Sequence, residues 1–452
     1  MKPSPFSRIF GNLGVDQPII LSVLNIIRSM LGGPLIALLI ALRFTPEEQG
    51  FYFTFSSVLA LQVFAEMGLS SVILQFASHE WGLLALSASG AVEGDGESMS
   101  RLAGIVRFAR RWYGIASIVT SFGLAMGGYL FFSHHPHSGI SWAGPWVSLC
   151  VLTGVKLFLS PFFSILEGCG QMKKVYGYRL AEGLALLIVA LCAIYFGAGL
   201  WTAVFATTVS IVMALLFLWT YYRKFYLSLL NAPISARVDW REEMLPMQWR
   251  IAVSWLCGYF TYQLFTPILF NYQGAAVAGQ FGLVWSVVNA VSSISMVWTS
   301  TKLPIYGGLI ARREYLQLDR LAKRAVWGST AVAIAGSLAV LLGMLILDRW
   351  YPTIAHRFLS VGPCAILLAA AILTQLSYAQ SAYLRAHKRE PFLGLSIGAS
   401  ILTGASTWYF GSHSGPLEMA LGFFLVVALF TLPVGTAIFL RCRTRWHSEI
   451  FT

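Results

Sequence analysis

The chain has 452 residues and a formal net charge of +12 at pH 7; 57% of its residues are hydrophobic and 11% are charged. Soluble domains carry about a quarter charged residues, so this composition excludes a water-soluble globular protein. Apolar runs of about twenty residues, the length that crosses a ~30 Å hydrocarbon core, recur about twelve times. We therefore expect an all-α polytopic membrane protein.

The first predicted span is retained rather than cleaved. Lys2 and Arg8 precede an apolar run that is too long for the core of a signal peptide and lacks a small-residue cleavage site. The predicted spans are residues 18–42, 51–77, 112–132, 143–166, 178–197, 200–221, 250–270, 280–301, 325–347, 361–383, 391–410 and 417–440.

Basic residues concentrate in alternate connections between the spans. With both termini inside, 26 of the 31 Lys and Arg residues are cytoplasmic; the exceptions are Arg43, Arg349 and Arg357 outside, and Arg28 and Lys156 within spans. This asymmetry follows the positive-inside rule and predicts a multi-pass protein of the cell inner (cytoplasmic) membrane with both termini cytoplasmic. The basic clusters are expected to contact anionic membrane lipids, which explains the net charge without nucleic acid.

The loops contain little that could carry chemistry. His134, His135 and His137 have no carboxylate or cysteine nearby, so we interpret them as a solvated loop and expect no metal site. The acidic stretch 93–97, within the inner connection 78–111, is typical of a flexible linker. The sequence contains no phosphate-loop motif and no HExxH, GxSxG or CxxC motif, so we expect neither an enzyme nor a cofactor.

Three ionisable residues lie deep within predicted spans: Arg28, Glu66 and Lys156. An ionisable group near the bilayer centre costs roughly 2.5–3.5 kcal/mol on insertion scales, so each needs an explanation. For Arg28 and Glu66 two interpretations stay open, an ion pair that joins two helices or groups that line a cavity. Lys156 has no acidic partner at its own depth, which favours a cation facing a substrate. Two deep cations against one deep anion favour an anionic passenger.

Polar side chains accompany these charges on the same helix faces, and a further stripe lies on the eighth span. A helical periodicity of 100° per residue places such residues on one face, which should line a helix seam or a cavity rather than face lipid. Ordinary Ser and Thr packing is an alternative, above all in the rear half. Glu66 is also a candidate to bind a coupling H⁺ or Na⁺. The candidate cavity residues besides the three ionisable ones are Asn25, Gln62, Ser160, Ser286 and Asn289.

The chain divides into two halves of six spans each. We predict an N-terminal lobe over 1–222, a cytoplasmic linker over 223–249 and a C-terminal lobe over 250–452. Gly50 aligns with Gly279, and each opens the second span of its half. Two halves of like orientation imply parallel repeats.

Helix breakers occupy matched places in the first span of each half. Gly32, Gly33 and Pro34 interrupt the first span, and Pro267 lies near the corresponding place in the seventh. Broken helices at matched positions indicate a central transport site, although a simple packing kink is an alternative.

Two segments carry a resemblance to a known family. The run TPEEQGFYFTFSSVLALQVFAEMGLSSVILQFASHE (45–80) resembles the early segment of bacterial O-antigen flippases, the Wzx-like polysaccharide transporters. The run AGQFGLVWSVVNAVSSISMVWTSTKLPIYGGLIARREYLQLDRL (278–321) is similar to its counterpart in the wider MOP superfamily, which includes the MATE exporters and lipid II flippases.

The resemblance implies a V-shaped bundle of two six-helix lobes that opens alternately to either side. It also implies that an undecaprenyl-pyrophosphate-linked oligosaccharide, such as an O-antigen repeat unit, moves from the inner to the outer leaflet. Arg28 and Lys156 would then meet the pyrophosphate. Polysaccharide polymerase and chain-length proteins would be partners.

Three alternatives remain at this point. A MATE-type multidrug or ion antiporter needs a deep carboxylate free of cationic partners, which Arg28 and Lys156 disfavour. A membrane-embedded polysaccharide-assembly enzyme usually needs a larger outer loop than any here. A scaffold for such enzymes would tolerate substitution of the intramembrane polar residues.

Overall fold

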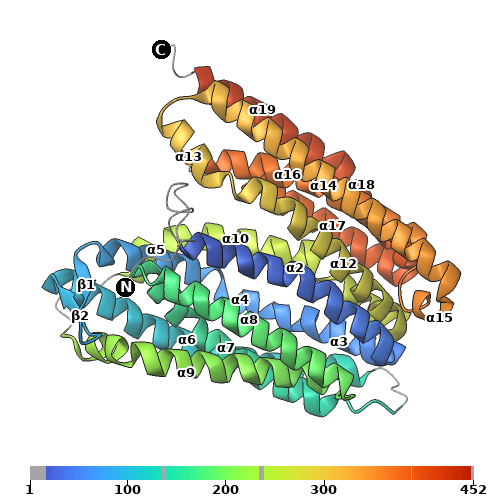
Figure 1. Ribbon diagram of the computed structural model, residues 1–452, viewed down its shortest axis with the longest axis horizontal. Helices are drawn as coiled ribbons and strands as arrows, with labels where there is room; N and C mark the ends of the chain where they lie inside the picture. The colour runs from blue at the N-terminus through green and yellow to red at the C-terminus, as the bar shows by residue number, and fades with distance from the viewer. Residues whose placement is uncertain (1–16, 135–138, 234–238, 388, 449–452) are drawn as a thin grey trace, which may run out of the picture. The chain divides into compact units, whose positions relative to one another are not determined.

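The computed structural model describes residues 17–134, 139–233, 239–387 and 389–448. It is almost entirely α-helical (Figure 1), which confirms the all-α polytopic class. In this part of the chain nine helices are long and apolar enough to cross a membrane, or ten if a pair bent by 46° counts as one span. Helices occupy all twelve predicted spans, but α10–α11 and α17 do not meet that criterion.

The helices form two compact units. Unit 1 comprises Met1–Gly32 and Leu61–Ala252, and unit 2 comprises Gly33–Ala60 and Val253–Thr452. This division differs from the predicted lobes in residues 33–60, which pack with the rear half.

Unit 1 contains the first part of α2 and the helices up to the start of α10. Its buried core includes Tyr113, Ile165 and Phe225, contributed by three different helices. The elements of unit 1 are α2 (Gln17–Arg43, shared with unit 2), a 3₁₀ turn Ala60–Gln62 that begins in unit 2, α4 (Val63–Glu66), α5 (Leu69–Trp81), β1 (Leu84–Leu86), β2 (Val92–Gly94), α6 (Gly96–Ser133), α7 (Ala143–Gly168), α8 (Met172–Tyr195), α9 (Trp201–Asn231), a π-helical turn Trp240–Met244, and the start of α10 (Leu245–Tyr262).

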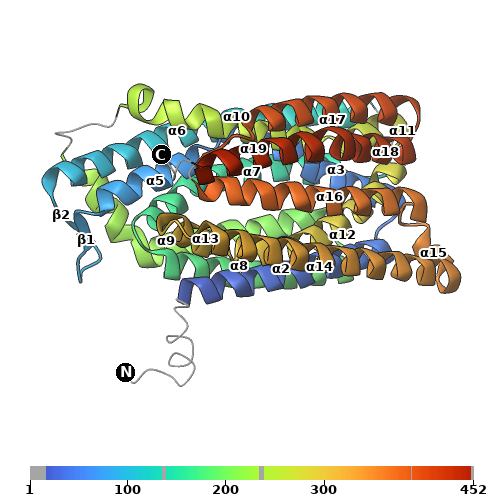
Figure 2. The same ribbon diagram turned by 90° about the horizontal axis from the view of Figure 1, so that it is seen from above.

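A short hairpin corrects the prediction of a flexible linker at residues 93–97. Strands β1 and β2 pair antiparallel, and their contacts with α5, α6 and α9 hold the hairpin at one end of these helices (Figure 2). Asp95 then caps α6 by accepting a hydrogen bond of 2.9 Å from the Ser98 amide. The acidic residues therefore serve as a strand end and a helix cap, because the cap satisfies an otherwise unpaired amide.

Charge pairs join this hairpin end to the π-helical turn. Arg101 donates hydrogen bonds to Glu80 at 2.8 Å and to Glu243 at 2.7 Å. The hydrogen bond from the Arg101 guanidinium holds the pKa of the Glu243 carboxyl below its usual range. Trp112 and Trp240 stack nearby, with ring centroids 5.8 Å apart. The π-helical turn Trp240–Met244 is thus fastened to α6.

Unit 2 is arranged around α12, which packs against α3, α14 and α16. A second buried cluster at the far end of these helices includes Leu318, Tyr383 and Trp446. The remaining elements are α3 (Pro46–Leu59), α11 (Phe265–Gln273), α12 (Ala275–Ser300), α13 (Leu303–Ala311), α14 (Tyr315–Trp350), α15 (Pro352–Ala355), α16 (Val361–Ala386), α17 (Leu393–His413), α18 (Pro416–Val426), a π-helical turn Val427–Thr431 and α19 (Leu432–Ser448).

The two glycines aligned between the halves meet at the crossing of α3 and α12. A Cβ at Gly50 would lie 1.9 Å from the Ala275 carbonyl oxygen, and one at Gly279 would lie 2.7 Å from the Gly50 nitrogen. Ser57 and Thr266 bridge α3 to α11 with a hydroxyl–hydroxyl distance of 2.6 Å. These glycines allow the backbones to touch, which explains why α3 belongs to unit 2.

Candidate functional site

The second span is broken beside Glu66. Helix α4 ends at Glu66, Met67 and Gly68 take left-handed backbone angles (φ 46° and 66°), and α5 starts at Leu69. A side chain at Gly68 would meet Ile251, with its Cβ 2.3 Å from the Ile251 Cγ2 atom. The break therefore places the Glu66 carboxylate at the end of a short helix.

The expected break in the first span is wrong, whereas the one in the seventh is confirmed. Helix α2 continues through Pro34 as a single element, because losing one backbone hydrogen bond there does not interrupt the bonds on either side. In the seventh span, α10 ends at Tyr262 and α11 begins at Phe265, two residues before Pro267. In the front half the break lies in the second span instead, so the two breaks are not at matched positions.

A polar cavity of about 250 Å³ lies within unit 1, beside the helix break. It is bounded by the start of α5 and by α7, α8 and α9, and Glu66, Lys156 and Ser160 all line it. Three of the predicted site residues are therefore brought together. Its other polar lining residues are Ser70, Ser164, Tyr178, Arg179, Glu182 and Ser210.

Each carboxylate of this cavity is held by a hydroxyl group. Ser70 donates a short hydrogen bond to Glu66, and its oxygen lies 2.9 Å from the Tyr113 hydroxyl. Buried Ser210 donates a short hydrogen bond to Glu182. These bonds orient the carboxylate oxygens toward fixed donors without neutralising their charge.

The two cations of the cavity differ in their partners. Arg179 forms an ion pair with the buried Glu167 at the end of α7. Lys156, in contrast, forms no ion pair within the part of the chain that the structure describes, and its side chain is exposed. Lys156 is therefore available for an anion, as the sequence predicts, although the assignment of that role stays a prediction.

Arg28 lies apart from this cavity and pairs with neutral oxygens. Its guanidinium donates to Asn25 Oδ1 at 3.1 Å, Ser29 Oγ at 2.8 Å and the Gly183 carbonyl at 3.0 Å. The Arg28–Glu66 ion pair is thus not formed among the described residues, and that interpretation is wrong. Helix α2 turns Arg28 toward α8, where Gly183 leaves room for the guanidinium.

The remaining predicted residues are distributed elsewhere. Gln62 ends the 3₁₀ turn before α4 and is half-buried. Ser286 and Asn289 lie on α12 in unit 2, and both hydrogen-bond back to carbonyls of their own helix. Asn289 is exposed, and a role for it stays a prediction. Of the predicted histidine group, His135 and His137 lie outside the described residues.

Glu182 is the main residue that sequence reasoning missed. The predicted fifth span starts at 178, which places Glu182 near the membrane boundary, whereas α8 starts at Met172. Ten residues correspond to about 15 Å along the helix axis. With Glu182 included, the ionisable residues within the spans of unit 1 named here are two cations and two carboxylates rather than two cations and one. A fifth span drawn from Met172 would have placed Glu182 further from its boundary.

Comparison with known proteins identifies the class of fold. No family model and no curated protein matches the sequence. An inward-facing multidrug resistance MATE family transporter of the MOP superfamily superposes with a TM-score of 0.67 at 16% identity, covering 94% of this chain and 96% of that chain. The lipid II flippase MurJ, in an inward closed conformation, gives a TM-score of 0.60 at 12% identity, covering 96% and 92% respectively.

A third similar structure is an MOP superfamily transporter from Pyrococcus furiosus, with a TM-score of 0.52 at 15% identity and 99% of each chain covered. All three are transporters or flippases. Identities this low define a fold rather than an activity. The chain is therefore a multi-pass membrane protein with the fold of the MOP superfamily transporters.

Proposed function

We propose that this protein is a flippase that moves an undecaprenyl-pyrophosphate-linked oligosaccharide from the inner to the outer leaflet of the cytoplasmic membrane. Lys156, a cation without an ionic partner among the described residues, carries the proposal, because it lines a polar cavity within a helical unit. An ionisable side chain within a membrane-spanning helix has an unfavourable insertion free energy, so its presence indicates a role in moving or binding a ligand. The fold shared with a lipid II flippase supports this class of passenger.

The size of the cavity defines what it could hold. Its volume of about 250 Å³ is below the roughly 300–1,000 Å³ typical of ligand pockets. It therefore suits a phosphate or an ion and not a whole oligosaccharide. In this proposal Lys156 meets the pyrophosphate and Arg28 assists from α2.

The carboxylates favour a second candidate, an exporter of cations. Glu66 and Glu182 line the same cavity and together offer two negative charges to a cation. In that case the positive charge of Lys156 would compete with the cation. Both candidate functions place charge recognition in this cavity. They predict opposite effects on transport when Lys156 is removed.

The deciding experiment uses a strain that lacks the protein and asks whether lipid-linked oligosaccharide accumulates on its cytoplasmic side. Wild type, Lys156→Ala and Lys156→Arg are compared for rescue at equal protein levels. We expect accumulation in the deletion strain, rescue at least tenfold weaker with Lys156→Ala, and near-normal rescue with Lys156→Arg because it keeps the charge. The absence of accumulation in the deletion strain would exclude the flippase and leave the exporter.

A further inference from the structure

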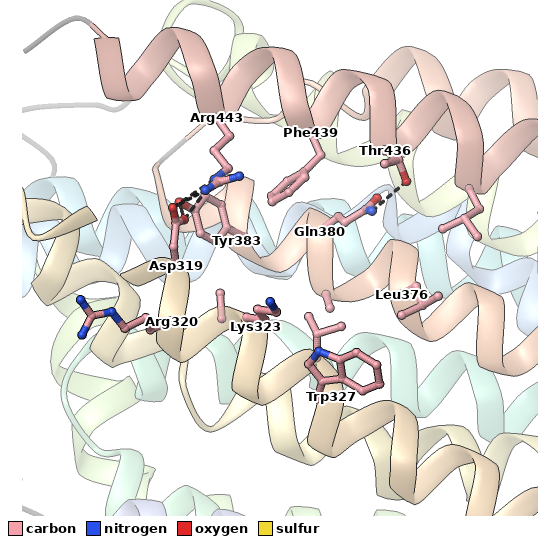
Figure 3. Close-up of a pocket in the computed structure, with 14 residues that line it drawn as sticks. Asp319, Arg320, Lys323, Trp327, Leu376, Gln380, Tyr383, Thr436, Phe439 and Arg443 are labelled. Carbon is pink, nitrogen blue, oxygen red and sulfur yellow. Dashed lines mark hydrogen bonds and ion pairs between the residues drawn. The ribbon is translucent and has the colours of Figure 1, made fainter. Parts of the chain in front are cut away.

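Unit 2 contains a groove that the proposed transport cavity does not explain. It has a volume of about 640 Å³ and lies among α14, α16 and α19 (Figure 3). Helix α16 packs against both α14 and α19 and forms its floor. All of its lining residues belong to unit 2, so the groove can be described without reference to unit 1.

A neutralised charge pair lies at one end of the groove. Arg443 on α19 donates to both carboxylate oxygens of Asp319 on α14, at 3.1 and 2.5 Å to Oδ2 and 3.2 Å to Oδ1. The Tyr383 hydroxyl of α16 donates to the same carboxylate at 2.8 Å. This bidentate geometry ties the three helices together. It also leaves Asp319 unavailable to neutralise other cations.

Two further cations line this end without such a partner. Arg320 and Lys323 are exposed and form no ion pair with any described residue. Arg320 also lines a second hollow of about 870 Å³ at the start of α14, together with Arg313 and Arg324. The polar end of the groove is therefore positively charged and open to an anion.

The groove becomes apolar away from these cations. Its lining there includes Val326, Trp327, Leu376 and Leu432. Gln380 and Thr436 are the polar exceptions, and they hydrogen-bond to each other at 2.8 Å (Figure 3). From Asp319 to Trp327 the helix rises about 12 Å at 1.5 Å per residue. Trp327 is 69% exposed, in keeping with an indole at a membrane boundary. A cationic end joined to an apolar channel matches an anionic amphiphile.

We propose that this groove binds an anionic phospholipid, with its phosphate at Arg320 and Lys323 and one acyl chain along Val326, Leu376 and Leu432. The exposed cations can hold a phosphate but cannot enclose it, so the ligand must be abundant to fill the site. Phospholipid is the anionic amphiphile that a bilayer supplies at high concentration. Binding there would brace α14 against α19 beside the Asp319–Arg443 pair.

The test compares lipid retention by purified, delipidated full-length protein, measured by native mass spectrometry. Phosphatidylglycerol and phosphatidylcholine with identical chains are supplied at equal concentration. We expect wild type to retain phosphatidylglycerol preferentially and the double variant Arg320→Gln/Lys323→Gln to bind it about thirtyfold more weakly. The matched control is Arg110→Gln/Arg111→Gln, two exposed arginines of α6 that lie outside the groove, and it should retain the lipid.

A phosphatidylglycerol with a photoreactive acyl chain locates the bound chain. Labelled peptides should come from α14, α16 and α19, and labelling should fall in the Arg320→Gln/Lys323→Gln variant. Equal retention in that variant and in wild type, or labels on other helices, would overturn the proposal. Displacement of phosphatidylglycerol by an equimolar polyprenyl phosphate would also overturn it and assign the groove to an isoprenoid carrier.

Discussion

The Arg28 guanidinium occupies space that is free only because residue 183 is a glycine without a side chain. A Cβ there would lie 2.4 Å from the Arg28 Cζ and Nε atoms, a distance that real Cβ atoms do not adopt. The guanidinium would have to leave the Gly183 carbonyl to which it now donates. Arg28 is half-buried and its side chain is flexible, so one methyl group on α8 should move the guanidinium of a residue on α2.

We therefore expect Gly183→Ala to destabilise the protein by no more than about 1 kcal/mol, the net contribution of one hydrogen bond, because the guanidinium at the end of a flexible side chain can move aside. If Arg28 also assists the cargo, the same variant should reduce transport. Thermal unfolding in detergent measures the first effect and the complementation assay measures the second.

Gly177→Ala provides the matched control on the same helix. The nearest atom to a Cβ at Gly177 is Leu21 Cδ1 at 3.9 Å, an ordinary contact. Alanine favours helix over glycine, so this control should be neutral or slightly stabilising. Equal stability of the two variants would show that Arg28 does not depend on the space at Gly183.

Residue by residue, the sequence identifies charges better than it identifies their partners. Lys156 and Glu66 are predictable because an ionisable group in the bilayer is costly wherever it lies. The partner of Arg28 is not predictable, because the position of a residue along its helix does not reveal which neighbouring helix its side chain faces. Glu66 and Arg28 share a depth, yet α2 presents Arg28 to α8. Glu182 was missed for a different reason, the late start assigned to its helix.

Among the elements, helix positions follow from hydropathy, whereas helix breaks depend on tertiary contacts. Pro34 lies inside a continuous α2, while the second span breaks at Met67 and Gly68, where no proline is present. The positive φ of Gly68 goes with the close approach of Ile251, about 180 residues away in the chain. The local sequence pattern does not predict such a long-range contact.

The α3–α12 crossing offers a test at this scale. We expect Gly50→Ala to disrupt the crossing and lower stability by about 1–3 kcal/mol or prevent folding, because its Cβ would lie 1.9 Å from a backbone oxygen that cannot move aside. Yield of monodisperse protein and the thermal midpoint measure this. Gly343→Ala, on α14 where nothing lies within 4 Å, is the control and should behave as wild type. A stable, monodisperse Gly50→Ala protein would contradict the proposed contact.

For the whole molecule, the open matter is what drives transport in one direction. The sequence has no phosphate-loop motif, so direction is expected to come from a gradient or from removal of the product. A potential of 100 mV supplies about 2.3 kcal/mol for each charge moved across the membrane. We propose Glu66 as the coupling residue, because it ends a broken helix, lines the cavity of Lys156 and is hydrogen-bonded to Ser70, whose hydroxyl also contacts Tyr113. Binding of H⁺ or Na⁺ at this carboxylate would change the charge that Lys156 meets.

We expect Glu66→Gln to keep basal transport but lose its response to an imposed H⁺ or Na⁺ gradient. Glutamine has the same shape and can still accept the Ser70 hydrogen bond, but it cannot take up a proton or balance a cation. The measurement follows exposure of the saccharide to a membrane-impermeant glycosidase in proteoliposomes, with and without the gradient. Glu93→Gln, at an exposed carboxylate of the hairpin, is the matched control and should respond as wild type does. If Glu66→Gln kept the full response, coupling would have to reside elsewhere, and Glu182 would be the next carboxylate to replace.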